Sequence, residues 1–362
     1  MNNATNDIRM KELVIGDKKA RLPIIQGGMG VGVSRSSLAG AVAKEGGVGI
    51  ISTAQIGYDE PGFDQDQASC NLRAIKKHIH LAKEQAQGGL VGVNVMVALK
   101  HYREHVQAAV EAGADVIICG AGLPMDLPGL VPADSGSKIA PIVSSARCAD
   151  LILKRWDKRY SRTADFVVVE GPKAGGHLGF SKEDAMNPPD MYEEIRKIID
   201  TVAVYGDRYG IHIPVIVAGG IYDRQDIAHA LSLGADGVQI ASRFVATVEC
   251  DASDAYKQAY IQARPEDIVI TDSPVGMPGR ALNNAFLQKV ARGEMSVKKC
   301  FNCLAKCNPA EIPYCITEAL IRAVQGDLDN GLIFCGANVG RIDKIVTVHE
   351  LMQELTGVHE LL

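Results

Sequence analysis

Hydrophobic residues gather in short runs up to about residue 245, and each run is followed by Gly, Asn or Pro and then by a helical pattern of apolar positions. Most of these runs are continuous and do not alternate with polar residues, which is typical of parallel strands buried on both faces. The pattern predicts eight strands, at residues 23–25, 48–51, 90–94, 116–119, 139–143, 166–169, 215–218 and 237–240.

Helical segments lie between these runs, and the repeated order of strand and helix indicates the fold class. Two helical segments end in the same phrase, Gly-Ala-Asp, at residues 113–115 and 234–236, where Gly stops the helix before the next strand. Eight such units are what a TIM (β/α)8 barrel requires, whereas an open doubly wound sheet usually has fewer and is the second choice. The predicted helices include residues 36–45, 101–112, 146–154, 191–204 and 224–233.

The chain has 362 residues, and a barrel of this class takes about 250. We therefore expect an α/β barrel over residues 10–245 and an appended segment over residues 246–362. The appended segment has helical and irregular patterns and a final helix near residues 348–355. The sequence thus predicts a TIM barrel with a helical, cysteine-containing C-terminal extension.

Composition excludes several classes of protein. With 47% hydrophobic and 22% charged residues, the chain has the proportions of a folded domain and not of a disordered or fibrous one. The net charge of -5 gives no general attraction to nucleic acid or to an anionic membrane. The N-terminus lacks the apolar core of a signal peptide, and no uncharged apolar run reaches the roughly 18 residues that span a bilayer. Nine cysteines at this density fit a reducing compartment, so we expect a cytoplasmic protein.

The Gly-rich segments follow predicted strands, so a barrel would bring them to the face that carries the active site. Gly219 and Gly220 follow the seventh strand, and Ala241 and Ser242 follow the eighth. Backbone N–H groups after these two strands commonly bind phosphate in such barrels. The alternative for these glycines is a tight turn that needs a positive φ.

Two further loops on the same face carry candidate chemistry. Gly27, Gly28 and Met29 have little bulk at the end of the first strand, so their backbone can lie against a flat ligand such as a flavin; a simple turn is the alternative. Their spacing is not that of a dinucleotide-binding fingerprint. His177 ends a glycine-flanked loop after the sixth strand and could transfer a proton near neutral pH, although a lone His is more often structural.

Four cysteines, Cys300, Cys303, Cys307 and Cys315, crowd into sixteen residues of the extension. Four thiolates at this spacing can ligate a [4Fe-4S] cluster. Structural zinc is the second choice, because its ligands usually form two CxxC pairs about 12 to 20 residues apart, and free or redox-active thiols are the third. Cys335 is a reserve ligand, and the remaining cysteines read as isolated and buried: Cys70, Cys119, Cys148 and Cys250.

The order of these motifs resembles the nitronate monooxygenase (2-nitropropane dioxygenase) family, whose FMN-binding barrel is shared with flavin-dependent enoyl-acyl-carrier-protein reductases. The resemblance covers roughly residues 10–290. It is carried by Pro-Ile-Ile-Gln-Gly-Gly-Met at residues 23–29, by Asn94, by Val-Val-Glu-Gly-Pro-Lys-Ala-Gly-Gly-His-Leu-Gly at residues 168–179, and by residues 216–244.

The resemblance implies an FMN site at the mouth of the barrel. It implies that the flavin ring lies near Gly27, Gly28, Met29 and Asn94, with Glu170 close to the ribityl chain. His177 matches the active-site histidine of the family. The implied phosphate site is formed by backbone around Gly175, Gly176, Gly219, Gly220, Gln239, Ile240, Ala241 and Ser242.

Two features depart from the pattern of the family. Lys173 stands where an acidic residue is commoner, and the usual members lack the four-cysteine cluster. Our leading expectation is an FMN-dependent oxidoreductase that oxidises alkyl nitronates with oxygen. The alternatives are an NAD(P)H-dependent flavin enoyl-thioester reductase, and a redox sensor or electron-transfer protein. We expect a small-molecule substrate, no nucleic acid or membrane partner, and exchange of single electrons with a redox protein through the cysteine cluster.

Overall fold

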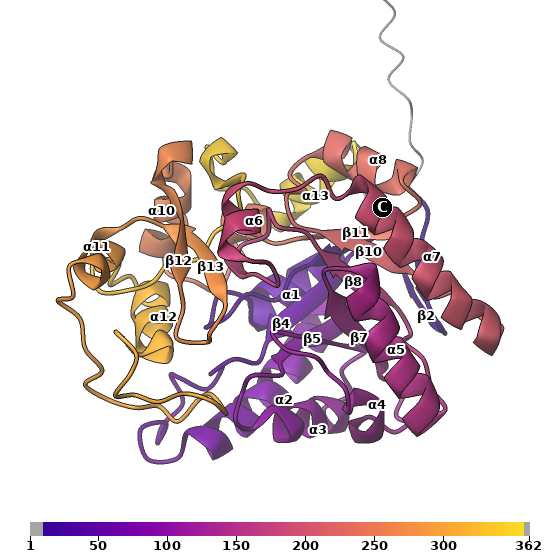
Figure 1. Ribbon diagram of the computed structural model, residues 1–362, viewed down its shortest axis with the longest axis horizontal. Helices are drawn as coiled ribbons and strands as arrows, with labels where there is room; N and C mark the ends of the chain where they lie inside the picture. The colour runs from indigo at the N-terminus through magenta and orange to yellow at the C-terminus, as the bar shows by residue number, and fades with distance from the viewer. Residues whose placement is uncertain (1–9, 358–362) are drawn as a thin grey trace, which may run out of the picture.

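Eight parallel strands close into a barrel in the computed structural model, which describes residues 10–357 (Figure 1). The order of hydrogen-bonded neighbours is β10-β11-β3-β4-β5-β6-β7-β8, and β8 pairs with β10 to complete the circle. The eight predicted strands and the predicted TIM-barrel class are therefore confirmed. The strands are β3 (Ile24–Gln26), β4 (Val48–Ser52), β5 (Leu90–Met96), β6 (Val116–Gly120), β7 (Lys138–Val143), β8 (Val167–Glu170), β10 (Val215–Ala218) and β11 (Gly237–Ile240).

Helices surround the barrel, and those predicted from the sequence are confirmed, two of them as longer elements. Helix α5 continues to Tyr160 and α7 to Tyr209. The helices between barrel strands are α1 (Ser36–Lys44), α2 (Gln67–Ala86), α3 (Tyr102–Glu111), α4 (Leu127–Leu130), α5 (Ala146–Tyr160), α6 (Lys182–Met186), α7 (Tyr192–Tyr209) and α8 (Arg224–Ser232), and α9 (Ser242–Val245) follows β11.

The repeated Gly-Ala-Asp phrase has a structural reason. In both copies the Asp carboxylate accepts a hydrogen bond from the backbone N–H at or near the start of a neighbouring strand: Asp115 from Val91 at 3.0 Å, and Asp236 from Val215 at 2.9 Å. These N–H groups lie at the amino ends of β5 and β10, where the neighbouring strand offers no carbonyl oxygen to accept the hydrogen bond. The carboxylates therefore satisfy donors that would otherwise be buried without a hydrogen bond.

A short N-terminal hairpin closes the end of the barrel opposite the carboxyl ends of its strands. Its strands are β1 (Leu13–Ile15) and β2 (Lys18–Ala20), which pair antiparallel. Leu13 and Ile15 belong to the same buried cluster as the side chains that fill the barrel interior. The ion pair between Lys18 and Asp115, at 3.1 Å, joins the hairpin to the turn before β6. One end of the barrel is thus packed, which leaves the other end for a site.

Most of the C-terminal extension lies on one side of the barrel, whereas its last helix lies next to α8, and the extension contains more than helices (Figure 1). Its strands β12 and β13 form an antiparallel hairpin, and β13 pairs with the two-residue strand β9 in the loop after β8. The sequence predicts a helical and irregular extension; the structure adds this hairpin to its helices, and the hairpin completes its hydrogen bonds on a barrel loop. The elements are β9 (Gly176–His177), α10 (Asp254–Gln262), β12 (Ile268–Asp272), β13 (Pro278–Leu282), α11 (Ala285–Ala291), α12 (Ile316–Val324) and α13 (Val348–Thr356), with 3-10 turns at Pro265–Asp267 and Val339–Arg341.

The helix expected near residues 348–355 is confirmed as α13, and Thr347 caps its first turn. Within residues 10–357, none of the helices combines the length and apolar composition needed to cross a bilayer.

Candidate active site

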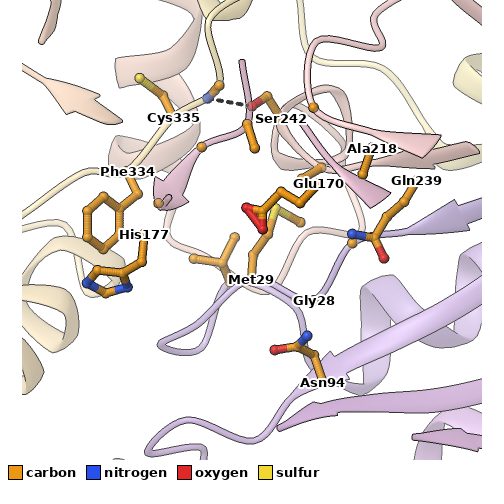
Figure 2. Close-up of a pocket in the computed structure, with 18 of the residues that line it drawn as sticks. Gly28, Met29, Asn94, Glu170, His177, Ala218, Gln239, Ser242, Phe334 and Cys335 are labelled. Carbon is orange, nitrogen blue, oxygen red and sulfur yellow. Dashed lines mark hydrogen bonds between the residues drawn. The ribbon is translucent and has the colours of Figure 1, made fainter. Parts of the chain in front are cut away.

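The carboxyl ends of the barrel strands surround a cavity of about 240 Å³ (Figure 2). Loops after most of the strands contribute to it, as the positions of the glycine-rich segments predicted. Every residue predicted to bind flavin lines this cavity except Ile240, which is buried and accepts a hydrogen bond from Gly27 N–H at 2.8 Å. The lining residues from the prediction are Gly27, Gly28, Met29, Asn94, Glu170, Gly175, Gly176, His177, Gly219, Gly220, Gln239, Ala241 and Ser242.

The loop after β3 lies directly against Asn94. A Cβ atom built on Gly28 would be 2.5 Å from the Cβ of Asn94 and 3.0 Å from a methyl group of Ile50, so only a glycine fits at this position without a shift. Met29 is held by Ser34, whose Oγ accepts from Met29 N–H at 2.8 Å. The result is a narrow strip of backbone with a fixed course and little side-chain bulk, which suits the face of a planar ring.

Glu170 places a carboxyl group without a protein partner in the middle of the cavity. Figure 2 shows the side chain extending from the end of β8 into the open space above Met29. Among residues 10–357 no side chain or backbone group hydrogen-bonds to this carboxyl, and burial raises the pKa of Glu170 to about 8. A buried carboxyl group without a hydrogen bond is costly, so this group is suited to a bound molecule with hydroxyl groups.

The loops after β8 and β10 meet at a second end of the cavity. Gly219 and Gly220 have φ values of +90° and +93°, and their N–H groups donate no hydrogen bond within the described residues. The side chain of Lys173 passes next to Gly220, and Lys173 is exposed without an ion pair in the described part of the chain. Free N–H groups beside an unpaired cation form a site for an anion such as phosphate.

Part of the extension closes this end of the cavity, which the sequence did not indicate. The segment 334–338 lines the cavity, and the N–H of Gly336 donates to Ser242 Oγ at 2.9 Å (Figure 2). Asn338 donates to the carbonyl oxygen of Gly220 at 2.7 Å. Cys335 belongs to this wall. Cys300, Cys303, Cys307 and Cys315 line a different cavity, so the prediction of Cys335 as a reserve metal ligand is wrong.

His177 is positioned by the hairpin of the extension. It belongs to β9, which pairs with β13, and its Nε2 lies 2.7 Å from Ser273 Oγ in the turn between β12 and β13. The ring of Phe334 packs edge-on against the imidazole, with 4.9 Å between ring centres (Figure 2). Burial lowers the pKa of His177 to about 4, so the ring is neutral at pH 7.

Arg280 supports the glycine-rich loop from behind. Only 3% of its surface is exposed, and its guanidinium donates to the carbonyl oxygens of Pro172 at 2.7 Å and Ala185 at 2.7 Å, and also to that of Ala174. These bonds fix the course of the loop between Glu170 and His177. Neither Arg280 nor Ser273 has a local sequence signal, because each acts on residues about a hundred positions away.

The four clustered cysteines lie away from this cavity. Cys300, Cys303, Cys307 and Cys315 line a separate small cavity between α11 and α12. Among residues 10–357, however, no group of three or more His, Cys, Asp and Glu side chains is arranged to hold a metal ion. The structure therefore does not support the predicted iron–sulfur cluster, and it does not support the zinc alternative.

A family model shows the family of this chain, and two further comparisons show which proteins it is similar to. The profile of the nitronate monooxygenase family matches residues 11–357. A (3aS,4S,5R,7aS)-5-hydroxy-7a-methyl-1-oxo-octahydro-1H-indene-4-carboxyl-CoA dehydrogenase of Mycobacterium tuberculosis is 28% identical over 271 residues, which are 75% of this chain and 66%, just under two thirds, of that protein. A probable nitronate monooxygenase of Staphylococcus saprophyticus is 25% identical over 304 residues, 78% of this chain and 81% of that protein. The structure of FabK from Thermotoga maritima has 28% identity and a TM-score of 0.68, covering 92% of this chain and 91% of that chain.

Proposed function

The chain belongs to the nitronate monooxygenase family, a family of oxidoreductases, and we propose that it binds FMN and oxidises alkyl nitronates with oxygen. The observation that carries the proposal is the cavity itself. It combines a bare glycine strip, a carboxyl group without a partner, an anion site and a neutral histidine within about 240 Å³.

The residues present fit FMN at three points. The strip of Gly27, Gly28 and Met29 suits the flavin ring, because the two glycines bring backbone without side chains to the cavity. The ribityl hydroxyls would give the Glu170 carboxyl the hydrogen bonds that the protein does not supply. The phosphate would lie on the N–H groups after β10, beside Lys173. This gives Lys173 a role as the counter-charge of the phosphate.

FMN, when bound, supplies the redox chemistry toward substrate and oxygen. The protein supplies a proton acceptor. If Nε2 of His177 donates its proton to Ser273 Oγ, the lone pair of Nδ1 is left to accept a proton from the carbon next to a nitro group. With a pKa of about 4, His177 is available as a neutral base over the physiological range, and it places no positive charge in the cavity before the substrate enters.

The test is oxygen uptake by the purified flavoprotein with a series of alkyl nitronates. His177→Ala should retain FMN, because His177 is not part of the glycine strip. With a neutral nitroalkane, whose carbon must first lose a proton, the variant should lose activity by about 10²- to 10⁴-fold. A preformed nitronate has already lost that proton, so the variant should oxidise it at nearly the wild-type rate. Absence of turnover with every nitronate would refute the substrate assignment while leaving FMN binding to be judged by the flavin spectrum.

A second candidate is reduction of an enoyl thioester by NAD(P)H through FMN. The similarity to a dehydrogenase of a carboxyl-CoA compound and to FabK, each at 28% identity, supports a thioester substrate. This candidate predicts that NAD(P)H reduces the flavin without oxygen and that an enoyl thioester reoxidises it. A flavoprotein that turns over neither class of substrate would favour a sensor or electron-transfer protein.

A further inference from the structure

A second cavity, of about 290 Å³, lies next to the cavity of the proposed flavin site. Its walls come from the loop between β4 and α2, from the start of α3 and from residues 301–303 of the extension. Ser52 and Ala54, at the end of β4, line the flavin cavity, whereas Gln55 lines the second cavity. The end of β4 is therefore a wall that the two cavities share.

Gln55 directs a hydrogen-bond donor into the second cavity. Asn71 Oδ1 accepts from Gly57 N–H at 2.9 Å, so Asn71 Nδ2 is the donor to Gln55 Oε1 at 2.6 Å. This fixes the orientation of the Gln55 amide, whose Nε2 hydrogen-bonds no group among residues 10–357. Gln55 is 5% exposed, and its Nε2 is not sealed by neighbouring atoms, so it faces the open space of the cavity. A buried donor without a partner is costly, so this one is suited to a bound molecule.

His105 adds an acceptor to the same cavity. Its Nδ1 lies 3.2 Å from Thr53 Oγ, and that hydroxyl donates to the carbonyl oxygen of Asn94 at 3.3 Å. Because a hydroxyl has one proton, Thr53 Oγ accepts from Nδ1–H, and His105 Nε2 carries a lone pair. Burial lowers the pKa of His105 to about 4, so the ring is neutral at pH 7. Within the described residues Nε2 has no hydrogen-bond partner, although only 3% of His105 is exposed.

The charges around the cavity favour a neutral ligand. Among the described residues that line it there is no lysine or arginine to pair with a phosphate or carboxylate. Asp66 is the one carboxylate, and it caps α2, where it accepts from Ser69 N–H at 3.0 Å and from Ser69 Oγ at 2.6 Å. Leu99 and Phe301, both buried, give the cavity apolar walls. The lining therefore fits a neutral group with one acceptor, one donor and apolar flanks.

A secondary amide has these features, because its C=O and N–H point to opposite edges and carbon chains extend from both ends. We propose that the second cavity binds a neutral secondary amide, which accepts from Gln55 Nε2 and donates to His105 Nε2. A sugar fits less well, since Leu99 and Phe301 would leave several of its hydroxyls without partners. The amide has two possible sources, a small free amide and the pantetheine arm of a thioester. The proposal does not depend on which substrate the flavin cavity takes.

The bound amide would be coupled to the flavin site through one chain of hydrogen bonds. His105 Nδ1 meets Thr53 Oγ, and both the N–H and the Oγ of Thr53 donate to the carbonyl oxygen of Asn94, at 3.1 and 3.3 Å. Asn94 in turn lines the flavin cavity. A ligand on Nε2 therefore acts on the residue that contacts the glycine strip.

The experiment is nitrogen NMR of the full chain with labelled histidine, titrated with N-butylacetamide and with S-methylpantetheine, whose blocked thiol cannot react with Cys303. We expect both amides to move the Nε2 resonance of His105 to saturation, and butyl acetate, which lacks the N–H, to leave it in place. Tighter binding of S-methylpantetheine would identify the arm of a thioester as the source, and equal affinity a small amide. The proposal is overturned if neither amide moves the resonance, or if butyl acetate or glucose moves it as far.

Variants test the two contacts by calorimetry with the same amides. Gln55→Glu keeps an oxygen for Asn71 but loses the donor, so the Kd should rise at least about fivefold. His105→Leu should have a similar effect. His78→Leu is its matched control: His78 is buried, its Nδ1 lies 2.9 Å from Ser36 Oγ, and it lines neither cavity.

An unchanged Kd in Gln55→Glu would contradict the proposal, and so would equal Kd values for His105→Leu and His78→Leu. If His105→Leu does not fold, Gln55→Glu decides the question alone. The flavin spectrum of the same samples reports FMN content separately, so failure of the amide site and failure of the flavin proposal are distinguishable.

Discussion

Replacing Gly219 by Ala tests whether the loop after β10 forms a phosphate site. At φ +90°, the new Cβ would be 2.7 Å from the carbonyl oxygen of Gly171 and 3.1 Å from the N–H nitrogen of Ala174. Ordinary contact begins at 3.4 Å, so the 171–174 loop must move by about 0.7 Å, the difference between 3.4 and 2.7. We expect about 1–2 kcal/mol of backbone strain and about 1–3 kcal/mol from overpacking.

Gly234→Ala is the matched control. Gly234 has φ +100°, but its nearest neighbour would be a methyl group of Ile199 at 3.5 Å, and it lies outside the cavity. This variant should therefore carry the backbone strain alone. The two free energies of unfolding, measured with urea on the apoproteins, should differ by about 1–3 kcal/mol.

The decisive comparison is FMN affinity, measured by quenching of flavin fluorescence. If displacement of the loop weakens FMN binding by about 1–3 kcal/mol at the phosphate, the Kd for FMN of Gly219→Ala rises about 5- to 150-fold. The Kd of Gly234→Ala should stay near the wild-type value. Equal Kd values for the two variants would refute the reasoning, because the phosphate would then not rest on this loop.

Three further predictions concern single groups. Ser273→Ala should lower kcat about 2- to 10-fold with unchanged FMN content, since it removes the 2.7 Å contact that orients His177; steady-state kinetics with an unchanged kcat would contradict this role. Burial raises the pKa of Glu170 to about 8, so this side chain is largely protonated at pH 7 and resembles a glutamine. In an FMN titration, Glu170→Gln should therefore bind FMN about as tightly as the wild type, whereas Glu170→Ala should bind it more weakly. Equal FMN affinities of the two variants would argue against a contact between Glu170 and FMN. Burial lowers the pKa of His105 from 6.5 to about 4, so its contribution to stability is present above pH 6.5 and is lost as the pH falls toward 4. Between pH 7 and pH 5 that loss is about 2 kcal/mol of the free energy of unfolding. Urea unfolding at the two pH values should therefore show a decrease in this free energy that is about 2 kcal/mol smaller for His105→Gln than for the wild type.

Much of the barrel could be predicted because its signals are local. Continuous apolar runs such as residues 166–169 and 215–218 are long enough to indicate buried strands, and glycines mark the loops that follow them. A barrel then brings all such loops to one face, so Gly28, Glu170 and Gly219 could be placed together without coordinates.

The rest of the cavity depends on contacts across the sequence. Ser273 and Phe334 meet His177 only because the β12–β13 hairpin pairs with β9, and two-residue strands such as β9 leave no periodic pattern. Residue type alone groups Cys335 with the other cysteines, whereas the structure places it in the wall of the cavity at the barrel mouth. The boundary between residues 245 and 246 stays a prediction, and the pairing of β13 with β9 joins the two segments closely.

The central claim is tested most directly by adding an alkyl nitronate to the purified flavoprotein without oxygen and recording its absorption spectrum. We expect the nitronate to bleach the flavin in the wild type. We also expect the neutral nitroalkane to bleach the flavin of His177→Ala far more slowly than that of the wild type at equal FMN content. A flavin that nitronates leave unchanged, but that NAD(P)H bleaches and an enoyl thioester restores, would contradict the proposed oxidation and establish the reductase in its place.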